Sequence, residues 1–353
     1  MLTAVTGATG FLGMHLVREL LARRHRLLLL ARPHPLPARA RVERFLRASG
    51  AGEEELRVAR TCLEAVEIDL EDGFLGLGRE DFQRLADRID VLWHCAGNVS
   101  FTASLEVARR TNVGGTRHVL RLLSAGERAP LLHHMSTVAV AGARDGGVVA
   151  EEVLDASSGF HTPYEQSKFE AEALVHRWVS EDGGRAVVFR PSGLVTRRSA
   201  HPDCPRHPLQ ALAQHVGAML RRHPELAAGT KPVPLPLRAG ADTNILPVEH
   251  AVYAMVEAGA RRAPGGPRIY HVVNHANVPM TEVIAAVGDH FAVRVDTAWR
   301  PPTGQWDVRQ ALPAYACWLT CSRTYEDGNL ARLGLAYPGQ PVVDRDYVAT
   351  ALR

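Results

Sequence analysis

The chain begins with a glycine-rich segment that separates a short apolar run from an amphipathic stretch. Residues 2–5 are predicted to form a strand and residues 13–23 a helix, joined by Thr6-Gly7-Ala8-Thr9-Gly10-Phe11-Leu12-Gly13. Glycine at the first position permits a tight turn, at the second it lets the backbone approach a pyrophosphate, and at the third it allows close helix–strand packing. The helix N-terminus adds free N–H groups and positive potential. The segment therefore predicts a dinucleotide site formed by Gly7, Thr9, Gly10, Phe11, Leu12 and Gly13.

Short apolar runs and amphipathic stretches continue to alternate through the first half of the chain. Strands are expected at 27–31, 66–68, 91–95, 131–135 and 186–189, and helices at 38–48, 80–88, 112–123 and 164–179. This alternation is typical of βαβ units around a parallel sheet. We therefore expect an α/β fold, a Rossmann-type doubly wound sheet with a smaller mixed C-terminal lobe. Residues 1–199 and 241–275 are predicted to bind the cofactor, and residues 200–240 and 276–353 to bind the substrate.

Bulk composition excludes several classes of protein. A net charge of +3 over 353 residues does not favour nucleic acid as a partner. Five scattered cysteines indicate a reducing cytoplasm rather than a disulfide framework, and no apolar run is long enough to span a membrane. The 17 histidines show no metal-ligand spacing, so no metal site is predicted. The oligomeric state is left open.

The residue after the second expected strand bears on the choice of cofactor. An NAD-preferring site would place a carboxylate there for the ribose hydroxyls, whereas this chain has Arg32. A guanidinium suits a 2′-phosphate, and the prediction is NADPH. Asp69 and Leu70 follow the third strand and are expected near the adenine. Ala96 and Gly97 follow the fourth strand and are expected to bring bare backbone close to the cofactor.

Tyr164 and Lys168 stand four residues apart at the start of a predicted helix, on one face. A free tyrosine has a pKa near 10, and bringing it to about 7 requires roughly 4 kcal/mol of differential stabilisation. We expect the Lys168 ammonium to supply part of it. Thr137, just after the fifth strand, can donate its hydroxyl to the same substrate oxygen. The lysine is one of only two in the chain, beside Lys231, so it stands out against an arginine-rich background.

Together these residues resemble the extended short-chain dehydrogenase/reductases, and further segments resemble their thioester reductase branch. That branch includes terminal reductase domains of peptide and polyketide synthases and fatty acyl-CoA reductases. The resemblance covers roughly residues 1–275 and rests on the segments 69–77, 89–97, 112–116, 135–138, 190–193 and 246–249. It implies Arg32 and Arg41 at the 2′-phosphate, Asn112 at the cofactor, and Pro191, Ser192, Gly193 and Leu194 beside the nicotinamide, with Thr137, Tyr164 and Lys168 in catalysis.

The function expected from this resemblance is NADPH-dependent reduction of an acyl thioester to an aldehyde, and possibly onward to an alcohol. The thioester would be carried on phosphopantetheine, by coenzyme A or by a carrier protein. A ketone or aldehyde reductase is the main alternative, and a non-catalytic NADPH-binding sensor is an alternative of another class. The aromatic residues of the lobe are expected either to line an acyl pocket, to touch a membrane surface or to pack as ordinary core: Trp299, Trp306, Tyr315 and Trp318.

Overall fold

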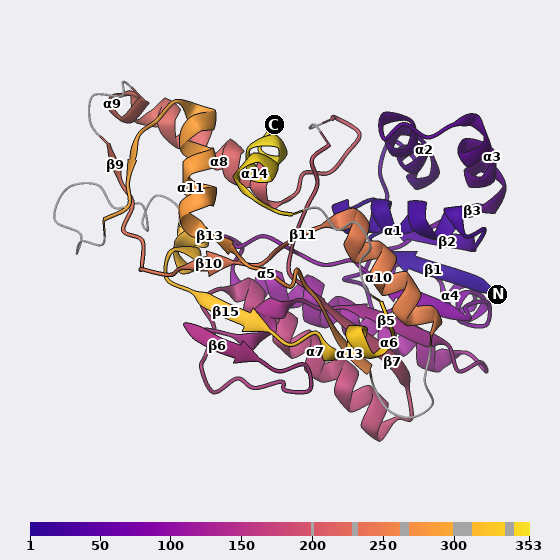
Figure 1. The fold of residues 1–353 in the computed structure, drawn as a ribbon. Coiled ribbons are helices and arrows are strands. Elements are labelled where there is room, and N and C mark those ends of the chain that lie inside the picture. Colours follow the sequence, from indigo (N-terminus) through magenta and orange to yellow (C-terminus); the bar gives the residue numbers. More distant parts are fainter. Residues whose placement is uncertain (199–200, 228–231, 262–267, 299–312, 336–341) are drawn as a thin grey trace.

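A seven-stranded parallel sheet forms the centre of the molecule (Figure 1). The computed structural model describes residues 1–198, 201–227, 232–261, 268–298, 313–335 and 342–353. The order across the sheet is β12-β7-β5-β4-β1-β2-β3, and every neighbouring pair is parallel. The strands are β1 (Leu2–Thr6), β2 (Arg26–Ala31), β3 (Leu63–Glu67), β4 (Val91–His94), β5 (Leu131–Met135), β7 (Arg185–Pro191) and β12 (Arg268–Val272).

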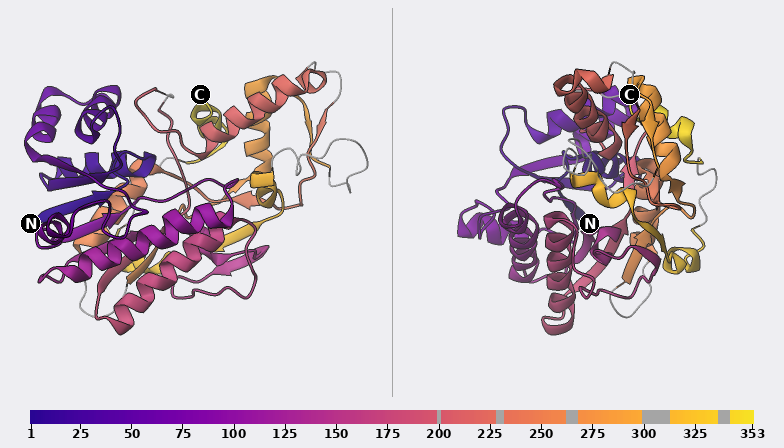
Figure 2. Two further views of the ribbon diagram at one scale, coloured as in Figure 1. Left: turned by 180° about the vertical axis from the view of Figure 1, so that it is seen from behind. Right: turned by 90° about the vertical axis from the view of Figure 1, so that its left-hand side faces the viewer.

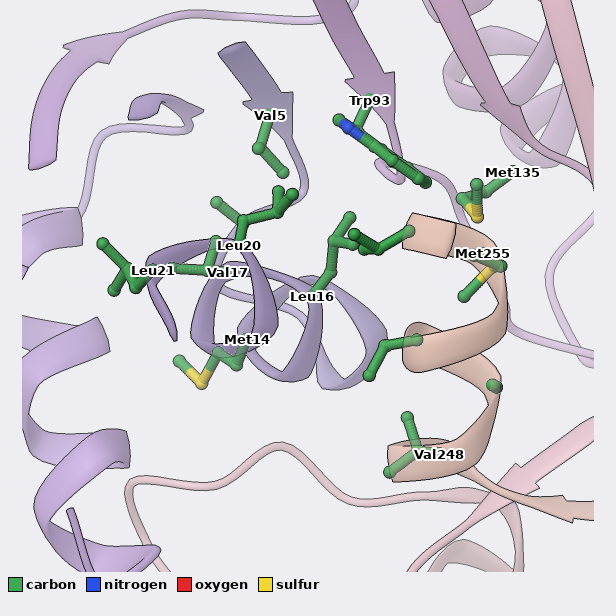
Figure 3. Close-up of a cluster of buried hydrophobic side chains, with 14 of the residues drawn as sticks. Val5, Met14, Leu16, Val17, Leu20, Leu21, Trp93, Met135, Val248 and Met255 are labelled. Carbon is green, nitrogen blue, oxygen red and sulfur yellow. The ribbon is translucent and has the colours of Figure 1, made fainter. Parts of the chain in front are cut away.

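Helices cover both faces of this sheet, as expected for a Rossmann-type fold. One face carries α1 (Phe11–Ala22), α2 (Ala38–Ala48), α3 (Glu53–Cys62) and α10 (Val248–Ala260). The other carries α4 (Arg79–Ala86), α6 (Gly115–Ala125) and α7 (Pro163–Glu181). Figure 3 shows the apolar faces of α1 and α10 packed against each other and against the sheet, with Leu16 and Met255 near Trp93.

The strand order reverses direction at β1, between β4 and β2. Successive units of such a sheet leave the strand ends in opposite directions at this point, which opens a crevice outside the carboxyl ends of the strands. The glycine loop after β1 and the Ala96 loop after β4 both start at this edge. The topology therefore brings together the segments that the sequence assigned to the cofactor.

The expected elements are confirmed with small shifts, apart from the region before β3. The strand expected at 66–68 begins at Leu63, and α3, directly before it, was not predicted. β3 lies at the edge of the sheet and alternates buried with exposed residues, so its pattern is weaker than the continuous apolar runs of central strands. The expected helix over 112–123 begins as a π-turn, Arg110–Gly114, which follows α5 (Leu105–Arg109).

A second hydrophobic core lies in the C-terminal half, apart from the sheet (Figure 2). It is built by α8 (Pro208–Arg222), α11 (Met280–Phe291) and α14 (Arg345–Ala351). The short α9 (Pro224–Ala227) follows α8, and two short ladders, β9 (Val233–Pro234) with β14 (Val295–Asp296) and β10 (Asp242–Thr243) with β13 (Val278–Pro279), complete this region. It forms the smaller lobe that the sequence predicted.

Other parts of the C-terminal half join the sheet region to the lobe. β8 (Gly193–Val195) pairs with β11 (Ile245–Pro247), and β6 (Gly146–Val149) pairs with β15 (Ser322–Tyr325). α13 (Gly328–Arg332) packs beside β12. The predicted division into cofactor and substrate parts stays a prediction. Within the described residues, no helix combines the length and apolarity needed to cross a membrane.

Candidate active site

The loop after β1 leaves no room for a side chain at Gly7 or Gly13. Gly7 has φ of +67°, and a Cβ there would lie 2.6 Å from the backbone nitrogen of Ala96. A Cβ on Gly13 would lie 2.0 Å from the carbonyl oxygen of Gly7. Both distances are far below van der Waals contact, so only glycine fits. The N-terminus of α1 has no side-chain cap and no acidic residue in its first turn, which suits a bound pyrophosphate.

Arg32 and Arg41 lie close enough for their charges to interact across the loop after β2. Burial lowers the pKa of Arg41, and the nearby Arg32 guanidinium lowers it further. In the described part of the chain, no ion pair joins either guanidinium to a carboxylate. Arg32, directly after β2, and Arg41, in α2, are thus two neighbouring cations without a carboxylate partner among the described residues.

The loop after β4 is tied to the catalytic helix by Asn112. The Oδ1 atom of Asn112 accepts the Asn98 backbone N–H at 2.7 Å, and its Nδ2 atom donates to the Asn98 carbonyl at 3.0 Å and to the Ser167 hydroxyl at 2.9 Å. Ser167 in turn donates to the carbonyl of Tyr164 at 2.9 Å. Asn112 thus fixes the cofactor loop relative to α7, and its side chain is occupied by protein groups. π-Turns of the kind that holds it are frequent at functional sites.

Helix α7 begins immediately before Tyr164, the predicted proton donor. Thr162 caps the helix in a reciprocal capping box with Glu165, and Pro163 occupies the first turn. This fixed start places the half-buried Tyr164 next to Thr137 at the end of β5, and the buried Lys168 one turn further along. The Thr137 hydroxyl oxygen accepts the Ala139 backbone N–H at 3.2 Å, and the same hydroxyl is hydrogen-bonded to the Tyr164 side chain.

Burial dominates the titration of this pair. Burial raises the pKa of Tyr164 to about 12, although the Thr137 hydroxyl acts in the opposite direction. Burial also lowers the pKa of Lys168 to about 8, opposed by the Glu172 carboxylate. In the chain without a cofactor, desolvation of the phenolate outweighs the polar contacts, so the lowering of the Tyr164 pKa by Lys168 together with a bound nicotinamide stays a prediction. The phenol stays protonated at neutral pH, as a proton donor must.

Lys168 rests on a buried polar network at the end of β5. Its Nζ donates to the carbonyl of Met135 at 2.5 Å, which leaves two N–H donors free for another partner. One helical turn further, Glu172 is completely buried and accepts from the Ser136 hydroxyl and from Arg190, whose Nη2 lies 2.6 Å from Oε1. Burial raises the pKa of Glu172, but His176, Arg190 and Ser136 together bring it to about 2.

The remaining predicted cofactor residues lie around the same crevice. Ala96 donates its N–H to the Thr6 hydroxyl at 3.2 Å, and a Cβ on Gly97 would lie 3.0 Å from the Asn112 Oδ1. Asp69 is exposed, whereas Leu70 is buried. The segment after β7 is held by backbone bonds from Ser192 to Val272 and from Gly193 to Asn244, with Pro191 and Leu194 buried beside them.

On the side facing the lobe, Tyr164 contacts an aromatic ring. Phe101, from the loop after β4, lies with its ring centroid 5.3 Å from that of Tyr164 and 6.3 Å from that of Tyr315. Tyr315 contacts Trp318 at 5.2 Å, and both belong to the lobe. Two of the four aromatic residues singled out in the lobe are therefore near the site, while Trp299 and Trp306 lie outside the described residues.

Comparison with known proteins identifies the family. The family described as "Male sterility protein", an NAD-binding family, matches residues 5–255. The chain belongs to this family. It is a thioester reductase-like member of the extended short-chain dehydrogenase/reductases, which places it among NAD(P)-binding oxidoreductases.

Individual relatives agree with this assignment. The chain is 29% identical over 283 residues to the aldehyde reductase lnaA of Aspergillus flavus, covering 76% of this chain and 25% of that protein. It is 28% identical over 315 residues to an isonitrile lipopeptide synthase of Streptomyces coeruleorubidus, covering 86% and 19%. The chain thus spans a quarter or less of the length of these two relatives.

The solved structures that resemble this reductase-family chain support the fold. The terminal R domain of the myxalamid PKS-NRPS pathway superimposes with a TM-score of 0.74 at 24% identity, covering 99% of this chain and 89% of that one. A UDP-galactose 4-epimerase superimposes with a TM-score of 0.66 at 20% identity, covering 100% and 97%.

Sequence reasoning missed several residues of this reductase site. Glu172 stands four residues after Lys168, a helical spacing that could have linked the two, and Arg190 was noted only as part of a family segment. Phe101 gave no signal, because its role depends on where the loop after β4 lies. The structure also brings ligand atoms of Asp145, His161 and Cys321 within 4.8 Å of one another, a trio that the sequence analysis did not contain.

Proposed function

We propose that this chain is an NADPH-dependent reductase that converts an acyl thioester, carried on phosphopantetheine, to an aldehyde. The observation that carries the proposal is the grouping of Thr137, just after β5, with Tyr164 and Lys168 of α7, in a fold whose loop after β1 admits only glycine at Gly7 and Gly13. In the proposal, Thr137 and Tyr164 donate hydrogen bonds to the substrate carbonyl oxygen. The Lys168 ammonium binds the ribose of the dinucleotide. In this proposal residues 1–199 with 241–275 hold the cofactor, and 200–240 with 276–353 hold the acyl group.

The preference for NADPH over NADH is supported by Arg32 and Arg41. Neither guanidinium is neutralised by a carboxylate in the described part of the chain, and each would gain a charge-assisted hydrogen bond from a 2′-phosphate. The bare N-terminus of α1 holds the pyrophosphate in the same proposal.

The bound cofactor supplies a hydride to the thioester carbonyl carbon. Tyr164, protonated at neutral pH, donates its proton to the carbonyl oxygen as negative charge develops there. Thr137 donates a second hydrogen bond to that oxygen, which stabilises the charge. Lys168 uses the N–H groups that Met135 does not occupy to hold the nicotinamide ribose. The hemithioacetal then loses the thiol and becomes the aldehyde.

A thioester substrate is supported by the relatives. Their names include a nonribosomal peptide synthetase and a lipopeptide synthase, assembly enzymes whose intermediates are thioesters on carrier proteins. A second candidate function, reduction of a free aldehyde or ketone, is favoured by the name of the aldehyde reductase lnaA. The same three residues would serve that reaction.

The test is NADPH oxidation with acyl-pantetheine and acyl-coenzyme A thioesters, run beside simple aldehydes and ketones. We expect thioester-dependent oxidation with release of one free thiol per aldehyde formed. Tyr164→Phe should lower kcat by about 10²–10⁴-fold, since a proton donor in the transition state is lost. Tyr253→Phe, on the outer face of α10, is the matched control and should be unchanged. Turnover of aldehydes or ketones alone, without thiol release, would replace the proposal with the second candidate.

A further inference from the structure

Three consecutive residues at the end of β5 contact one face of helix α7. Tyr164, Lys168 and Glu172 follow one another at intervals of four residues on that helix, so they share a face. Each of them is hydrogen-bonded to one residue of the segment 135–137. The pairs are Tyr164 with the Thr137 hydroxyl, Lys168 with the Met135 carbonyl, and Glu172 with the Ser136 hydroxyl. The first two pairs contain groups that act in the proposed reaction, and the third does not.

The Glu172 carboxylate is held in place from two directions. It is completely buried, and Arg190 of β7 donates to it from Nε at 3.1 Å and from Nη2 at 2.6 Å. His176, one turn further along α7, lies with its Nε2 atom 3.2 Å from Oε1 of Glu172. Glu172 is therefore fixed by the sheet and by its own helix as well as by the Ser136 hydroxyl.

Ser136 lies where the regular pairing of β5 ends. The strand ends at Met135, and one further backbone bond, from the Ser136 N–H to the Phe189 carbonyl at 2.8 Å, continues the contact with β7. The buried Ser136 hydroxyl donates to Glu172 and so ties this segment to α7 independently of the reacting groups. Fixing Ser136 also fixes the carbonyl before it and the hydroxyl after it.

We propose that Ser136 and Glu172 are positioning residues, which hold the end of β5 at the height along α7 where the proton donor and the ammonium act. This inference rests on the proposed function and assigns a role to two residues outside the reacting groups. A misplacement of about 1 Å at reacting groups can lower a rate about 10²-fold, so a contact behind them can control kcat. The pair acts on the rate of reduction rather than on substrate binding.

Ser136→Ala is the first test, because it removes the tie without leaving a buried charge unpaired. Glu172 keeps Arg190 and His176 as partners in this variant. We expect kcat for NADPH-dependent reduction of whichever carbonyl compound the wild type accepts to fall at least about tenfold, with the KM values for NADPH and substrate within about threefold of the wild type. Ser136→Thr, which restores the hydroxyl, should recover most of kcat.

Ser124→Ala is the matched control. The Ser124 hydroxyl accepts from the Trp178 Nε1 at 2.8 Å, so this variant also removes a hydroxyl bonded to α7, but about 20 Å along the helix from Tyr164. Its kcat should be unchanged. An unchanged kcat in Ser136→Ala, a loss confined to KM, or an equal loss in Ser124→Ala would overturn the inference. If the extra methyl group of Ser136→Thr prevents folding, the comparison of the two alanine variants decides.

The Lys168 ammonium gives a readout that needs no turnover. The chain has two lysines, so lysine labelled with a nitrogen isotope gives two side-chain NMR signals, and Lys168→Met identifies one of them. Loosening the Met135 carbonyl disfavours the ammonium, so in Ser136→Ala the pKa of Lys168 should fall below its wild-type value of about 8. Ser124→Ala should leave that pKa unchanged. The other titratable groups around the ammonium are the same in both variants: Glu172, Cys95, His94 and His134.

The two readouts separate the two proposals. A lower Lys168 pKa in Ser136→Ala, together with a wild type that reduces no carbonyl compound, would overturn the proposed function and retain the positioning role. Thioester reduction by the wild type, together with an unchanged Lys168 pKa in Ser136→Ala, would overturn the positioning role while the proposed function stands.

Discussion

The two sides of Tyr164 are built from opposite kinds of contact. On the sheet side, Lys168, Glu172 and Arg190 are buried. Lys168 donates a hydrogen bond to the carbonyl of Met135, and Arg190 donates to the carboxylate of Glu172. On the lobe side, the ring of Phe101 contacts the rings of Tyr164 and Tyr315, and Tyr315 belongs to the apolar core of the lobe. The hydrogen bonds on the sheet side fix the orientation of the groups around Tyr164. The contacts on the lobe side are apolar and have no preferred direction.

This difference teaches where the chain can change without losing its chemistry. Hydrogen bonds to buried ions are directional, and losing one partner leaves the other unsatisfied. Apolar contacts scale with area and tolerate rearrangement. We therefore expect the sheet side to determine the reaction and the lobe side to determine which acyl group reaches it.

The largest expected effect tests the sheet side. Glu172→Ala should lower the free energy of unfolding by about 3–5 kcal/mol, because Arg190 is left as a buried charge without its carboxylate. Chemical denaturation measures the loss. Glu170→Ala removes a partly exposed partner of Arg109 on the same helix and should cost at most about 1 kcal/mol. Equal losses of stability in the two variants would show that the buried Glu172–Arg190 pair contributes no more than the exposed Glu170–Arg109 pair.

An intermediate effect is expected at the far end of the cofactor site. The double variant Arg32→Ala with Arg41→Ala should raise the Kd for NADPH by at least tenfold, since each charge-assisted bond contributes about 1.5–3 kcal/mol. The Kd for NADH, which has no 2′-phosphate, should change by less than about threefold. Fluorescence titration with both nucleotides gives the ratio. A parallel weakening of both would assign these arginines to the fold rather than to the phosphate.

The smallest expected effect is the pH dependence of kcat/KM and of the free energy of unfolding. The direction of both changes follows from the titration of Lys168. Because burial brings the pKa of Lys168 to about 8, the ammonium is lost as the pH rises through that value, and kcat/KM should fall about tenfold between about pH 7 and 9. The free energy of unfolding should instead increase as the pH rises. The folded state binds this proton less tightly than the unfolded state does, so the contribution of Lys168 improves from about pH 8 towards 10.5.

Lys168→Met provides the reference for both measurements. The kcat/KM of the variant should not fall near pH 8. Its free energy of unfolding should exceed that of the wild type at neutral pH, and the difference should shrink as the pH rises. A wild-type kcat/KM that does not change up to pH 10 would mean that Lys168 keeps its proton during the reaction. Burial on the sheet side of Tyr164 would then affect the reaction less than we expect.

The sequence by itself determined the features that depend on local pattern. Gly7, Gly10 and Gly13 between a strand and a helix are sufficient to predict the phosphate loop, because the steric demand acts over a few residues. Tyr164 and Lys168 share a helix face for the same reason. Short apolar runs, such as those of β1 and β2, alternate with amphipathic helices, and this alternation predicted the parallel sheet.

Only the tertiary structure decided what depends on residues far apart in the chain. Arg190 meets Glu172 because α7 packs against β7, and no pattern of neighbouring residues in the sequence predicts that pairing. Phe101 and Tyr315 lie far apart in the chain but in contact in the fold, and the burial that raises the pKa of Tyr164 in the chain without a cofactor depends on all the elements packed around it. Desolvation and long-range packing are sums over the whole surroundings, so a pattern of neighbouring residues does not determine them.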